Sequence, residues 1–408
     1  MVVGIPLACY NSYYVEQPQT KIKSNVMKAK KIDVLIPGLN AKNITNRASE
    51  GASEKKLNTE KVSTASPAVA EARTTIEESA ASETSTTFHP EKVSIIMPAF
   101  NAEDTIGEAI ASALNGTHQN LEILVIDDCS TDATEKTVTD MAAKDQRIKY
   151  YKNPTNLGAY KSRNLMMEAA TGQFLAFLDS DDTWEPNKLE ECLKMLKQHP
   201  EIKSVGHALR YIDKRGNKVG YIPTYPTNEE ELQEVQENGT IPWVFPTALV
   251  VEREAILEIG GFLEWKVAAD TELMARLAQK HGMLATKMPL GNYRVLGNSL
   301  TDKYWLDKRL AIDCVKENQL RRIRGQSELT LTEYREIFFQ NLPPLKKLNK
   351  LREIAATRFM RKAGESWLNR DILSTLVYGI AKTALNPQAT VHKIQCIKYQ
   401  KRLNQEFL

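Results

Sequence analysis

The clearest pattern in the sequence is a series of short apolar runs that alternate with segments carrying helix signals. Four runs rich in β-branched and other large apolar residues predict buried strands at 93–97, 121–126, 148–151 and 174–178. The segments that follow them predict helices at 104–114, 132–143, 158–170 and 186–198. Strands that alternate with helices at this spacing form a parallel sheet with helices on both faces. The expected fold class is therefore α/β, with a Rossmann-like, mostly parallel sheet.

Outside this repeating part the pattern changes twice. Beyond residue 203 it predicts a hairpin between 204 and 222, a strand at 248–251 and a helix at 269–281. From 46 to 87 the chain is rich in Ser, Thr, Ala, Glu and Lys, so this segment cannot bury enough apolar surface to order itself. We expect three regions: a disordered N-terminal region or linker at 1–91, an α/β domain at 92–301, and a basic all-helical region at 302–408.

Composition and charge exclude several classes of protein. The net charge of +3 over 408 residues gives no basic bias that would indicate a nucleic acid partner. The five cysteines are scattered and form no CxxC pair, so we expect a reducing compartment and no zinc site. The sequence has no run of about 18 apolar residues and no signal-peptide pattern at its start. We therefore expect a cytoplasmic protein without a transmembrane segment.

Acidic residues follow two of the predicted strands. Asp127 and Asp128 come at the end of the second strand, and Asp179, Asp181 and Asp182 follow the fourth. In a parallel sheet the carboxyl ends of the strands meet at one edge, where ligands bind. Neighbouring carboxylates repel one another unless a cation neutralises them, and oxygen ligands favour Mg²⁺ or Mn²⁺. The alternative is that these acidic turns are solvated and cap the helices that follow them.

Five motifs occur in the order and at the spacing typical of one enzyme family. They are VSIIMPAFNA at 93–102, VIDDCSTD at 125–132, NLGAYKSRN at 156–164, FLDSDD at 177–182 and GGF at 260–262. Together they resemble the motifs of family 2 glycosyltransferases, and the resemblance covers residues 92–301. It implies a GT-A fold, a nucleotide-sugar donor and a divalent metal ion, Mn²⁺ or Mg²⁺. A UDP-sugar is expected before a GDP- or dTDP-sugar.

The resemblance also assigns individual residues to the donor and the metal. Five residues would bind the nucleotide-sugar: Pro98, Phe100, Asp128, Arg163 and Asp179. Among these, Asp128 would accept a hydrogen bond from the base, and Arg163 would lie near the nucleotide unless it only forms a surface salt bridge. Asp179 would contact the ribose or the metal. Asp181 would be the direct metal ligand.

A carboxylate downstream of the GGF motif is the general base in the family that this sequence resembles. Relatives usually carry Glu-Asp where this chain has Ala269 and Asp270, so Asp270 occupies the base position. It would take the proton from the acceptor hydroxyl as that oxygen attacks the anomeric carbon, which inverts the configuration. The alternative is that Asp270 only caps the helix that it opens. Glu272 is the second candidate for the base.

Three other positions depart from the family pattern or leave alternatives open. Leu296 stands where many relatives have a histidine that helps to bind the metal or the pyrophosphate. We therefore expect Asp181 and the donor phosphates to provide most of the metal coordination. Trp243, in a Pro-rich stretch, either stacks on an acceptor sugar or packs in the core. Trp184, next to the acid cluster, either borders the donor site or packs.

The basic C-terminal region also has two interpretations. It either holds the protein near anionic lipid headgroups, at the inner face of a membrane where a lipid-linked acceptor would be found, or is a solvated helical face that packs against the α/β domain.

The sequence as a whole predicts an inverting glycosyltransferase. It would move a sugar from a nucleotide-sugar to a glycan or lipid-linked acceptor in the biosynthesis of polysaccharides or cell-surface glycans. The alternative is a catalytically weak scaffold that binds a nucleotide-sugar or glycan, because the family's Glu and His are replaced at 269 and 296. A nucleotidyltransferase is a weaker interpretation, since no Gly-rich phosphate loop follows the first strand.

Overall fold

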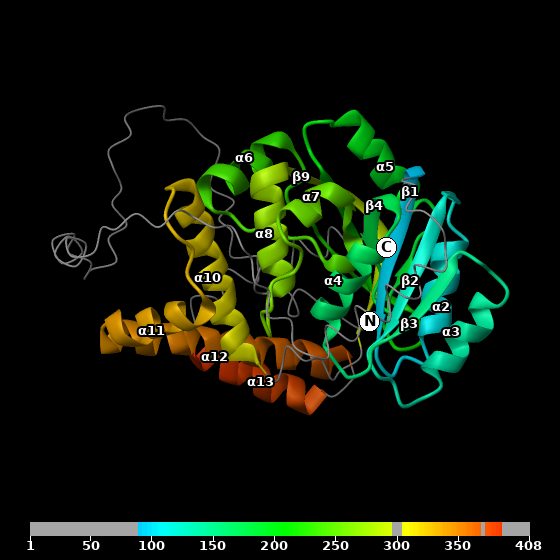
Figure 1. Cartoon of the computed structure of the whole chain (residues 1–408). Coiled ribbons are helices and arrows are strands. Elements are labelled where there is room, and N and C mark those ends of the chain that lie inside the picture. Colours follow the sequence, from blue (N-terminus) through cyan, green and yellow to red (C-terminus); the bar gives the residue numbers. More distant parts are fainter. Residues whose placement is uncertain (1–88, 296–303, 369–371, 386–408) are drawn as a thin grey trace.

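The computed structural model describes residues 89–295, 304–368 and 372–385, and Figure 1 shows how their elements are arranged. Two of the sequence-based expectations lie outside these residues: the disordered region, except for its last three residues, and the position of Leu296. The described residues form an α/β body, followed by helices α10 to α13. In Figure 1, α11, α12 and α13 lie along the lower edge of the molecule.

One mixed sheet forms the centre of the α/β body. Its strand order is β3-β2-β1-β4-β8-β6-β9-β5, and β7 pairs with β6 outside this path. Strands β3, β2, β1 and β4 run parallel, whereas β8 is antiparallel to both β4 and β6. The bounds are β1 His89–Ala99, β2 Leu121–Asp127, β3 Ile148–Lys152, β4 Gly172–Phe177, β5 Thr183–Trp184, β6 Ser204–Ile212, β7 Lys218–Ile222, β8 Val250–Glu252 and β9 Met283–Arg294. The predicted strands and the β6–β7 hairpin are therefore present.

Helices connect the strands and cover both faces of the sheet. Their bounds are α2 Ile106–Leu114, α3 Thr134–Ala142, α4 Ala159–Ala169, α5 Lys188–Gln198, α6 Glu229–Asn238, α7 Arg253–Glu258, α8 Ala269–His281, α10 Trp305–Ile323, α11 Leu331–Asn341, α12 Pro344–Leu368 and α13 Ile372–Leu385. A short 3₁₀ helix, η3, spans Pro246–Ala248. The α/β fold class expected from the sequence is confirmed.

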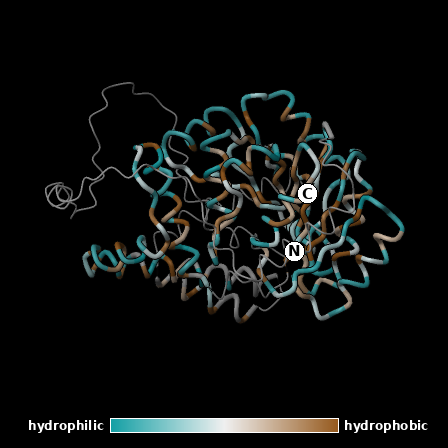
Figure 2. The backbone as a smooth tube through the Cα atoms, in the orientation of Figure 1, coloured by the Kyte–Doolittle hydropathy of each residue, from teal (hydrophilic) through white to brown (hydrophobic). Residues whose placement is uncertain are grey.

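Alternation along the strands explains how one sheet supports two cores. In β1, Val93, Ile95 and Met97 face a core that also contains residues of α2 and α5. Ile96, between them, faces the other core, which contains residues of α4, α7 and α8. Successive side chains of a strand point to opposite faces, so a strand covered on both faces is apolar at nearly every position. In Figure 2 the hydrophobic stretches accordingly run through the central strands.

The first strand is longer than the sequence predicts, and it runs through Pro98. A proline has no N–H to donate to a sheet, which is why the prediction ended the strand at 97. In the structure Leu178 donates to the carbonyl oxygen of Ile96 at 3.1 Å, so Ile96 faces β4. Pro98, two residues on, faces the same side, but the pairing of β1 with β4 ends at Ile96. The missing N–H of Pro98 therefore costs no ladder bond.

The carboxyl ends of the parallel strands lie together at one edge of the sheet. Ala99, the last residue of β1, is in register with Asp127, the last residue of β2. Strand β4 ends at Phe177, directly before the acid cluster. The loops that follow these strands therefore form a common rim, where ligands bind in sheets of this kind.

Helix α10, the first of the C-terminal helices, packs against α8 of the α/β body. Ala311, Ile312 and Val315 of α10 form a buried apolar cluster with Ala275 of α8. Two hydrogen bonds support this contact: Gln279 donates to the carbonyl oxygen of Gln319 at 3.2 Å, and Arg322 donates to Gln279 at 2.6 Å. Helix α10 therefore belongs to the body that carries the site.

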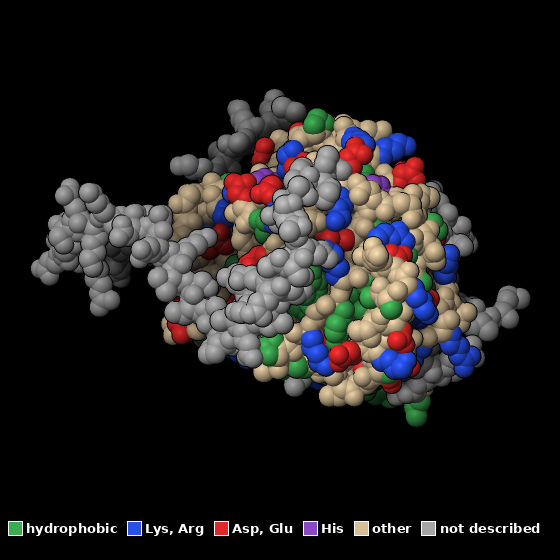
Figure 3. All heavy atoms as spheres, turned by 45° about the vertical axis from the view of Figure 1, so that its right-hand side comes forward, with side chains coloured by type: hydrophobic (Ala, Val, Ile, Leu, Met, Phe, Trp, Pro, Cys, Tyr) green, Lys and Arg blue, Asp and Glu red, His purple; other side chains and the backbone are tan. Residues whose placement is uncertain are grey.

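The described helices do not include one that is long and apolar enough to cross a membrane. Charged side chains of both signs are interspersed over the face shown in Figure 3. This face gives no sign of a single-sign surface over the α/β body.

Candidate active site

The acid cluster is a tight turn after β4 whose three carboxylates have different surroundings. The N–H of Asp182 donates to the carbonyl oxygen of Asp179 at 3.0 Å, which closes the turn. The carboxylate of Asp179 pairs with Arg163, and Asp182 Oδ1 accepts a hydrogen bond from the N–H of Arg294 at 2.9 Å. Asp181, between them, is half-buried. The turn is thus not a cage of three converging ligands, which suits an ion that takes most of its oxygens from phosphates and water.

Burial and mutual repulsion disfavour negative charge on two of these carboxylates. Burial, followed by the charge of Asp179, raises the pKa of Asp181 to about 6. Asp182 is 1% exposed. Its pKa lies well above the usual value because of burial and the charges of Asp181 and Asp179. A cation placed at Asp181 would favour the ionised form of that carboxylate.

Arg163 is part of the wall of the site and not a surface residue. It lies on α4, is 4% exposed, and pairs with Asp179 through Nη2. Its guanidinium lies 5.6 Å from the ring centroids of both Tyr160 and Phe262. The sequence-based alternative was a surface salt bridge. Arg163 does form a salt bridge, but its side chain is buried. The ion pair fixes Asp179 at the rim and gives the α4 side of the site a buried positive charge.

Arg294, which the motifs did not single out, holds the acid turn in place. It is the last residue of β9, and its side chain is 3% exposed. Its Nε donates to the carbonyl oxygen of Asp181 at 2.8 Å, and its Nη2 pairs with Glu108 at 2.6 Å. Its backbone N–H makes the bond to Asp182 described above. Arg294 lies two residues before Leu296, the position at which the chain departs from the family pattern, and this closeness was the signal that the sequence offered.

Asp127 and Asp128 are buried carboxylates that organise the loops after β2 and β3. Asp127 accepts hydrogen bonds from the N–H of Ser130 at 2.7 Å and from the hydroxyl of Tyr150 at 2.8 Å. Asp128 accepts from the N–H groups of Leu157 at 2.7 Å and Gly158 at 2.8 Å. Asp128 therefore ties the carboxyl edge of the sheet to the start of α4.

Most of the hydrogen-bonding capacity of Asp128 is used inside the protein. Besides the two backbone groups, Asn153 donates to it at 2.7 Å and the hydroxyl of Ser162 at 3.3 Å. Three of these four bonds go to Oδ1 and one to Oδ2. A carboxylate offers about four lone-pair positions. The remaining capacity lies on Oδ2, so any contact with a base would be made by that atom.

Pro98 and Phe100 differ in exposure although both belong to the first motif. Pro98 is buried in β1, whereas Phe100, just beyond the strand, is 52% exposed. The next residue, Asn101, has a φ of 48°, a left-handed conformation that asparagine tolerates better than most residues. Asn101 Oδ1 accepts a hydrogen bond from the N–H of Thr131 at 2.9 Å. The loops after β1 and β2 thus hold an exposed aromatic ring at the rim.

Asp270 lies in the first turn of α8 and is half-buried. The N-cap position belongs to Ala268, which has no side-chain acceptor and a φ of 58°. Asp270 therefore is not the N-cap, although its Oδ1 accepts a hydrogen bond from the N–H of Thr271 at 2.8 Å. A left-handed alanine costs conformational energy, and such strain is concentrated at functional sites. The backbone at Ala268 sets the direction in which α8 starts, and so the position of Asp270.

Glu272, the second candidate for the base, has a structural partner instead. It is 2% exposed, and both of its oxygens bind Arg276 at 2.6 Å. Arg276 also donates to the carbonyl oxygens of Ile259 at 2.5 Å and Gly261 at 2.7 Å. The pair therefore holds the GGF turn, and Asp270 is the better placed of the two carboxylates for a reaction.

The GGF turn is attached to α4 beside Arg163. The side-chain amide of Asn164 donates to the carbonyl oxygen of Phe262 at 2.8 Å and accepts from its N–H at 2.9 Å. A Cβ on Gly261, whose φ is 64°, would lie 2.7 Å from Asn164 Oδ1 and from Met167 Cε. Only glycine fits this contact without displacement. Asn164 was missed in the sequence, although the motif that contains it was quoted.

Trp243 and Trp184, for which the sequence left two interpretations each, both pack in the interior. Trp243 is 9% exposed and belongs to the core on the α4 and α8 face. Trp184 is buried, and its Nε1 donates to the carbonyl oxygen of Thr247 at 3.0 Å. Lys188, also buried, donates to the same carbonyl at 3.1 Å. For both tryptophans the structure supports the packing interpretation.

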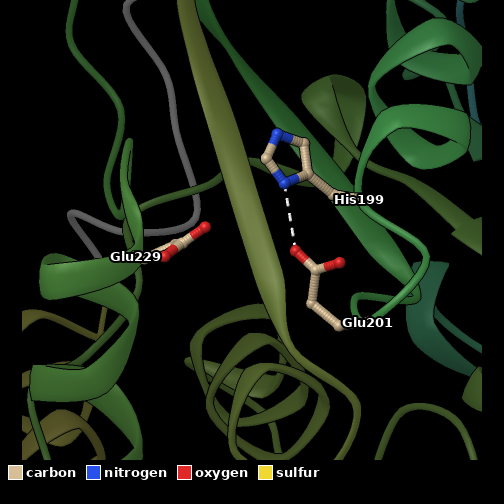
Figure 4. A group of neighbouring side chains, drawn as sticks. All are labelled: His199, Glu201 and Glu229. Atoms are coloured by element: carbon tan, nitrogen blue, oxygen red, sulfur yellow. Dashed lines mark hydrogen bonds and ion pairs between the residues drawn. The ribbon is translucent and has the colours of Figure 1, made fainter.

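A different group of side chains could also hold an ion by distance alone. In the described parts of the chain, His199, Glu201 and Glu229 have potential ligand atoms within 4.8 Å of one another (Figure 4). His199 Nδ1 lies 3.0 Å from Glu201 Oε1, so these two already interact. Glu201 and Glu229 are exposed, and Glu229 opens α6, where acidic residues interact favourably with the helix dipole. Local pairing explains this group, and we assign no metal to it.

Comparisons with known proteins agree with the motifs and the geometry. The model of the family described as glycosyl transferase family 2 matches residues 94–260. TuaG of Bacillus subtilis strain 168, a glycosyltransferase named for teichuronic acid biosynthesis, is 31% identical over 218 residues, which cover 52% of this chain and 82% of TuaG. The chain belongs to family 2 of the glycosyltransferases. The expected family and transferase class are confirmed, and the sheet with its flanking helices is of the GT-A type.

Other glycosyltransferases match shorter segments of the chain. WfgD of Escherichia coli, a UDP-Glc:α-D-GlcNAc-diphosphoundecaprenol β-1,3-glucosyltransferase, is 48% identical over 104 residues, 26% of this chain and 40% of WfgD. An uncharacterized glycosyltransferase of Haemophilus influenzae is 38% identical over 132 residues, 32% of this chain and 52% of that protein. The chain thus spans about half, or less, of the length of these two relatives.

Proposed function

We propose that this protein transfers a sugar from a nucleotide-sugar to a hydroxyl of a glycan or lipid-linked acceptor, with inversion at the anomeric carbon. The observation that carries the proposal is the half-buried carboxylate of Asp181 at the carboxyl edge of the sheet, with a pKa raised to about 6. In a family 2 chain, such a carboxylate is suited to a divalent ion and the diphosphate that accompanies it.

The nucleotide end of the donor would lie at the rim after β1 and β2. Phe100 is exposed there and offers an aromatic face on which a base can stack. Pro98 is buried beneath the rim and shapes its floor. Asp128 Oδ2 retains capacity for one more donor, which an imide N–H of the base would fill. Together these groups favour a pyrimidine nucleotide, and we propose a UDP-sugar.

The diphosphate would lie between the acid turn and α4. Asp181 would hold Mn²⁺ or Mg²⁺, and the ion would supply charge stabilisation to the leaving diphosphate. Asp179 would contact the ribose or the ion while Arg163 holds its carboxylate in place. Arg294 fixes the backbone of the turn, so that Asp181 keeps one position. The protein contributes orientation and preorganised charge to this step.

The acceptor hydroxyl would be activated by Asp270. Its carboxylate takes the hydroxyl proton as the acceptor oxygen bonds to the anomeric carbon and the bond to the diphosphate oxygen breaks. Attack from the face opposite the leaving group inverts the configuration. The free Oδ2 side of Asp270 would make this contact, because Oδ1 is bonded to the N–H of Thr271.

The acceptor class is proposed from the relatives. The name of WfgD states a diphosphoundecaprenol-linked acceptor, and that of TuaG states teichuronic acid biosynthesis. We propose a role in cell-surface glycan biosynthesis, on the cytoplasmic side of the membrane.

The test is release of nucleoside diphosphate from UDP-, GDP- and dTDP-sugars with Mn²⁺ or Mg²⁺, measured on the full chain. We expect release from one donor, loss of release with EDTA, and loss in Asp181→Ala. Asp270→Asn should lose turnover but still bind the donor. Asp140→Asn is the matched control, because Asp140 is an exposed aspartate on α3 paired only to Lys136 among the described residues.

Ala269 replaces the family's glutamate, and this replacement motivates a second candidate function. The protein would then be a scaffold that binds a nucleotide-sugar without efficient transfer. Metal-dependent nucleotide binding with no release from any donor, with or without candidate acceptors, would support the scaffold. Unchanged release in Asp270→Asn would remove Asp270 from the mechanism.

A further inference from the structure

Helices α12 and α13 form a hairpin at the lower edge of the molecule in Figure 1. They pack along each other, and the rings of Phe359 and Tyr378 lie 6.2 Å apart between their centroids. Among the described elements, α13 makes extensive contacts only with α12. The hairpin is therefore joined to the body mainly through α12, and α13 presents its far face outward.

The outward face of α13 is apolar. Leu373, Val377 and Ile380 are each between 55% and 75% exposed. Their spacing of four and three residues places them within an arc of about 60° on a helix with 3.6 residues per turn. Leu345 and Leu348 of α12 are also exposed. Of the large apolar side chains in the described residues, these five are the most exposed.

The two helices are also strongly basic. Together they contain eight lysine and arginine residues and two glutamates, a net charge of +6, whereas the whole chain has +3. The rest of the chain is therefore net negative. Lys346, Arg352 and Arg358 of α12 are exposed. Positive charge is thus concentrated on the same two helices that expose the apolar residues.

We propose that the α12–α13 hairpin is a docking surface for an anionic lipid bilayer. Exposed apolar side chains on one face, with cations beside them, are typical of helices that lie in the interface plane of a membrane. With 14 residues, α13 is too short to span a bilayer, which needs about 20. Anionic headgroups attract cations next to the membrane surface. The basic helices and the exposed stripe would therefore act together.

A second copy of this chain is the main competing occupant, and charge argues against it. In a twofold dimer the same surface of both copies meets itself. Two hairpins of net charge +6 would then face each other, and like charges at short distance repel. An anionic bilayer is complementary to the hairpin both in charge and in apolar character.

The proposal deepens the proposed function, because a surface-bound enzyme would meet a lipid-linked acceptor. The role of membrane binding rests on that function, whereas the binding itself does not. The binding test needs no turnover. Donor hydrolysis in solution, without vesicles, tests the active site separately. Failure of one measurement therefore leaves the other interpretable.

The experiment is co-sedimentation of the full chain with two kinds of vesicle, phosphatidylcholine alone and equal parts of phosphatidylcholine and phosphatidylglycerol. We expect binding to the anionic vesicles only, and weaker binding at high salt. Ile380→Glu should weaken binding by roughly tenfold or more, because it places a charge in the apolar stripe. Met288→Glu is the matched control: Met288 is an exposed methionine on β9, 40% exposed, and its replacement should leave binding unchanged.

A second variant separates lost binding from lost folding. Lys346→Glu reverses an exposed charge on α12 and leaves the apolar stripe intact, so it should lower binding to anionic vesicles and reduce the salt dependence. Equal binding of wild type and Ile380→Glu would overturn the proposal. So would a dimer in light scattering that Ile380→Glu dissociates, in a protein that does not sediment with either vesicle.

Discussion

Arg294 Nε donates a hydrogen bond of 2.8 Å to the backbone carbonyl oxygen of Asp181. The arginine is buried and also binds Glu108, so the turn that carries Asp181 is fixed to β9 and to α2 at once. Side chains that hold a metal-binding turn in place determine how well its metal-ligating side chain is oriented. The relationship makes Arg294 a positioning residue for the proposed metal site.

Replacement of Arg294 by lysine should therefore impair the metal site more than the donor site. A lysine carries the charge but cannot reproduce the planar set of donors to Asp181 and Glu108. We expect kcat to fall by about tenfold or more and the Mn²⁺ concentration for half-maximal rate to rise by a similar factor. The nucleotide Kd measured without metal should change little. The measurement is a metal titration of initial rates at saturating donor.

Arg147→Lys is the control for this variant, since Arg147 pairs with Asp145 and lies outside the candidate site. A merely structural role of Arg294 would lower thermal stability without shifting the metal dependence. That result would contradict the positioning role.

Metal-dependent activity should weaken as the pH is lowered through about 6. Burial and the charge of Asp179 raise the pKa of Asp181 to about 6, so below this pH the folded protein carries a proton that a metal ion must displace. The apparent metal affinity should fall roughly tenfold for each pH unit below the pKa. It should be nearly constant above it. Half-maximal Mn²⁺ concentrations at about pH 5 and about pH 7.5 check this.

The raised pKa of Asp181 also predicts that replacing this residue stabilises the folded protein, whereas most substitutions destabilise it. A carboxyl whose pKa is raised by folding contributes stability that is present at low pH and is lost as the pH rises through the folded pKa. Asp181→Asn removes this cost, so it should unfold at a higher temperature than wild type at about pH 7.5. Its free energy of unfolding should be larger by at most roughly 3 kcal/mol. The gain should vanish at about pH 4. A lower melting temperature of Asp181→Asn at neutral pH would mean that the carboxylate has a stabilising partner.

Asp270→Asn and Glu272→Gln should differ in kind, although the two residues are neighbours. Asp270 is half-buried and has only a local hydrogen bond to Thr271, so its replacement should abolish turnover and leave stability within about 1 kcal/mol. Glu272 is buried and holds Arg276, so Glu272→Gln should destabilise by about 3 kcal/mol. Thermal unfolding and kcat are measured on both variants. Loss of turnover only in Glu272→Gln would exchange their roles.

Phe100→Ala should weaken donor binding without affecting the fold. Phe100 is 52% exposed, so its removal costs little core packing. Stacking of a base on an aromatic ring contributes about 1–3 kcal/mol, so the donor Kd should rise by roughly tenfold. Calorimetric titration with UDP in the presence of Mn²⁺ measures this. Phe339→Ala, another exposed phenylalanine, on α11, is the control, and an equal effect of both variants would exclude stacking at Phe100.

Local sequence patterns were enough to find the parallel half of the sheet. The apolar runs at 121–126 and 174–178 match β2 and β4 closely, because strands covered on both faces need an apolar residue at nearly every position. The run at 148–151 matches β3, which is an edge strand. The first strand was predicted too short at both ends. Whether Pro98 interrupts a strand depends on whether the neighbouring strand still runs beside it, and β4 ends too early for that.

The sequence by itself determined the family, the strand ends that carry the acids and the position of Asp270 in the motif order, because these depend on local pattern and spacing. Only the tertiary structure decided which carboxylates remain available. Asp128 binds the start of α4, Glu272 binds Arg276, and Asp181 stays half-buried at the edge of the sheet. The reason is physical: a carboxylate reacts or binds a cation according to which donors already surround it. Those donors can lie more than a hundred positions away along the chain, as for the backbone N–H of Arg294 and the carboxylate of Asp182, which are 112 positions apart.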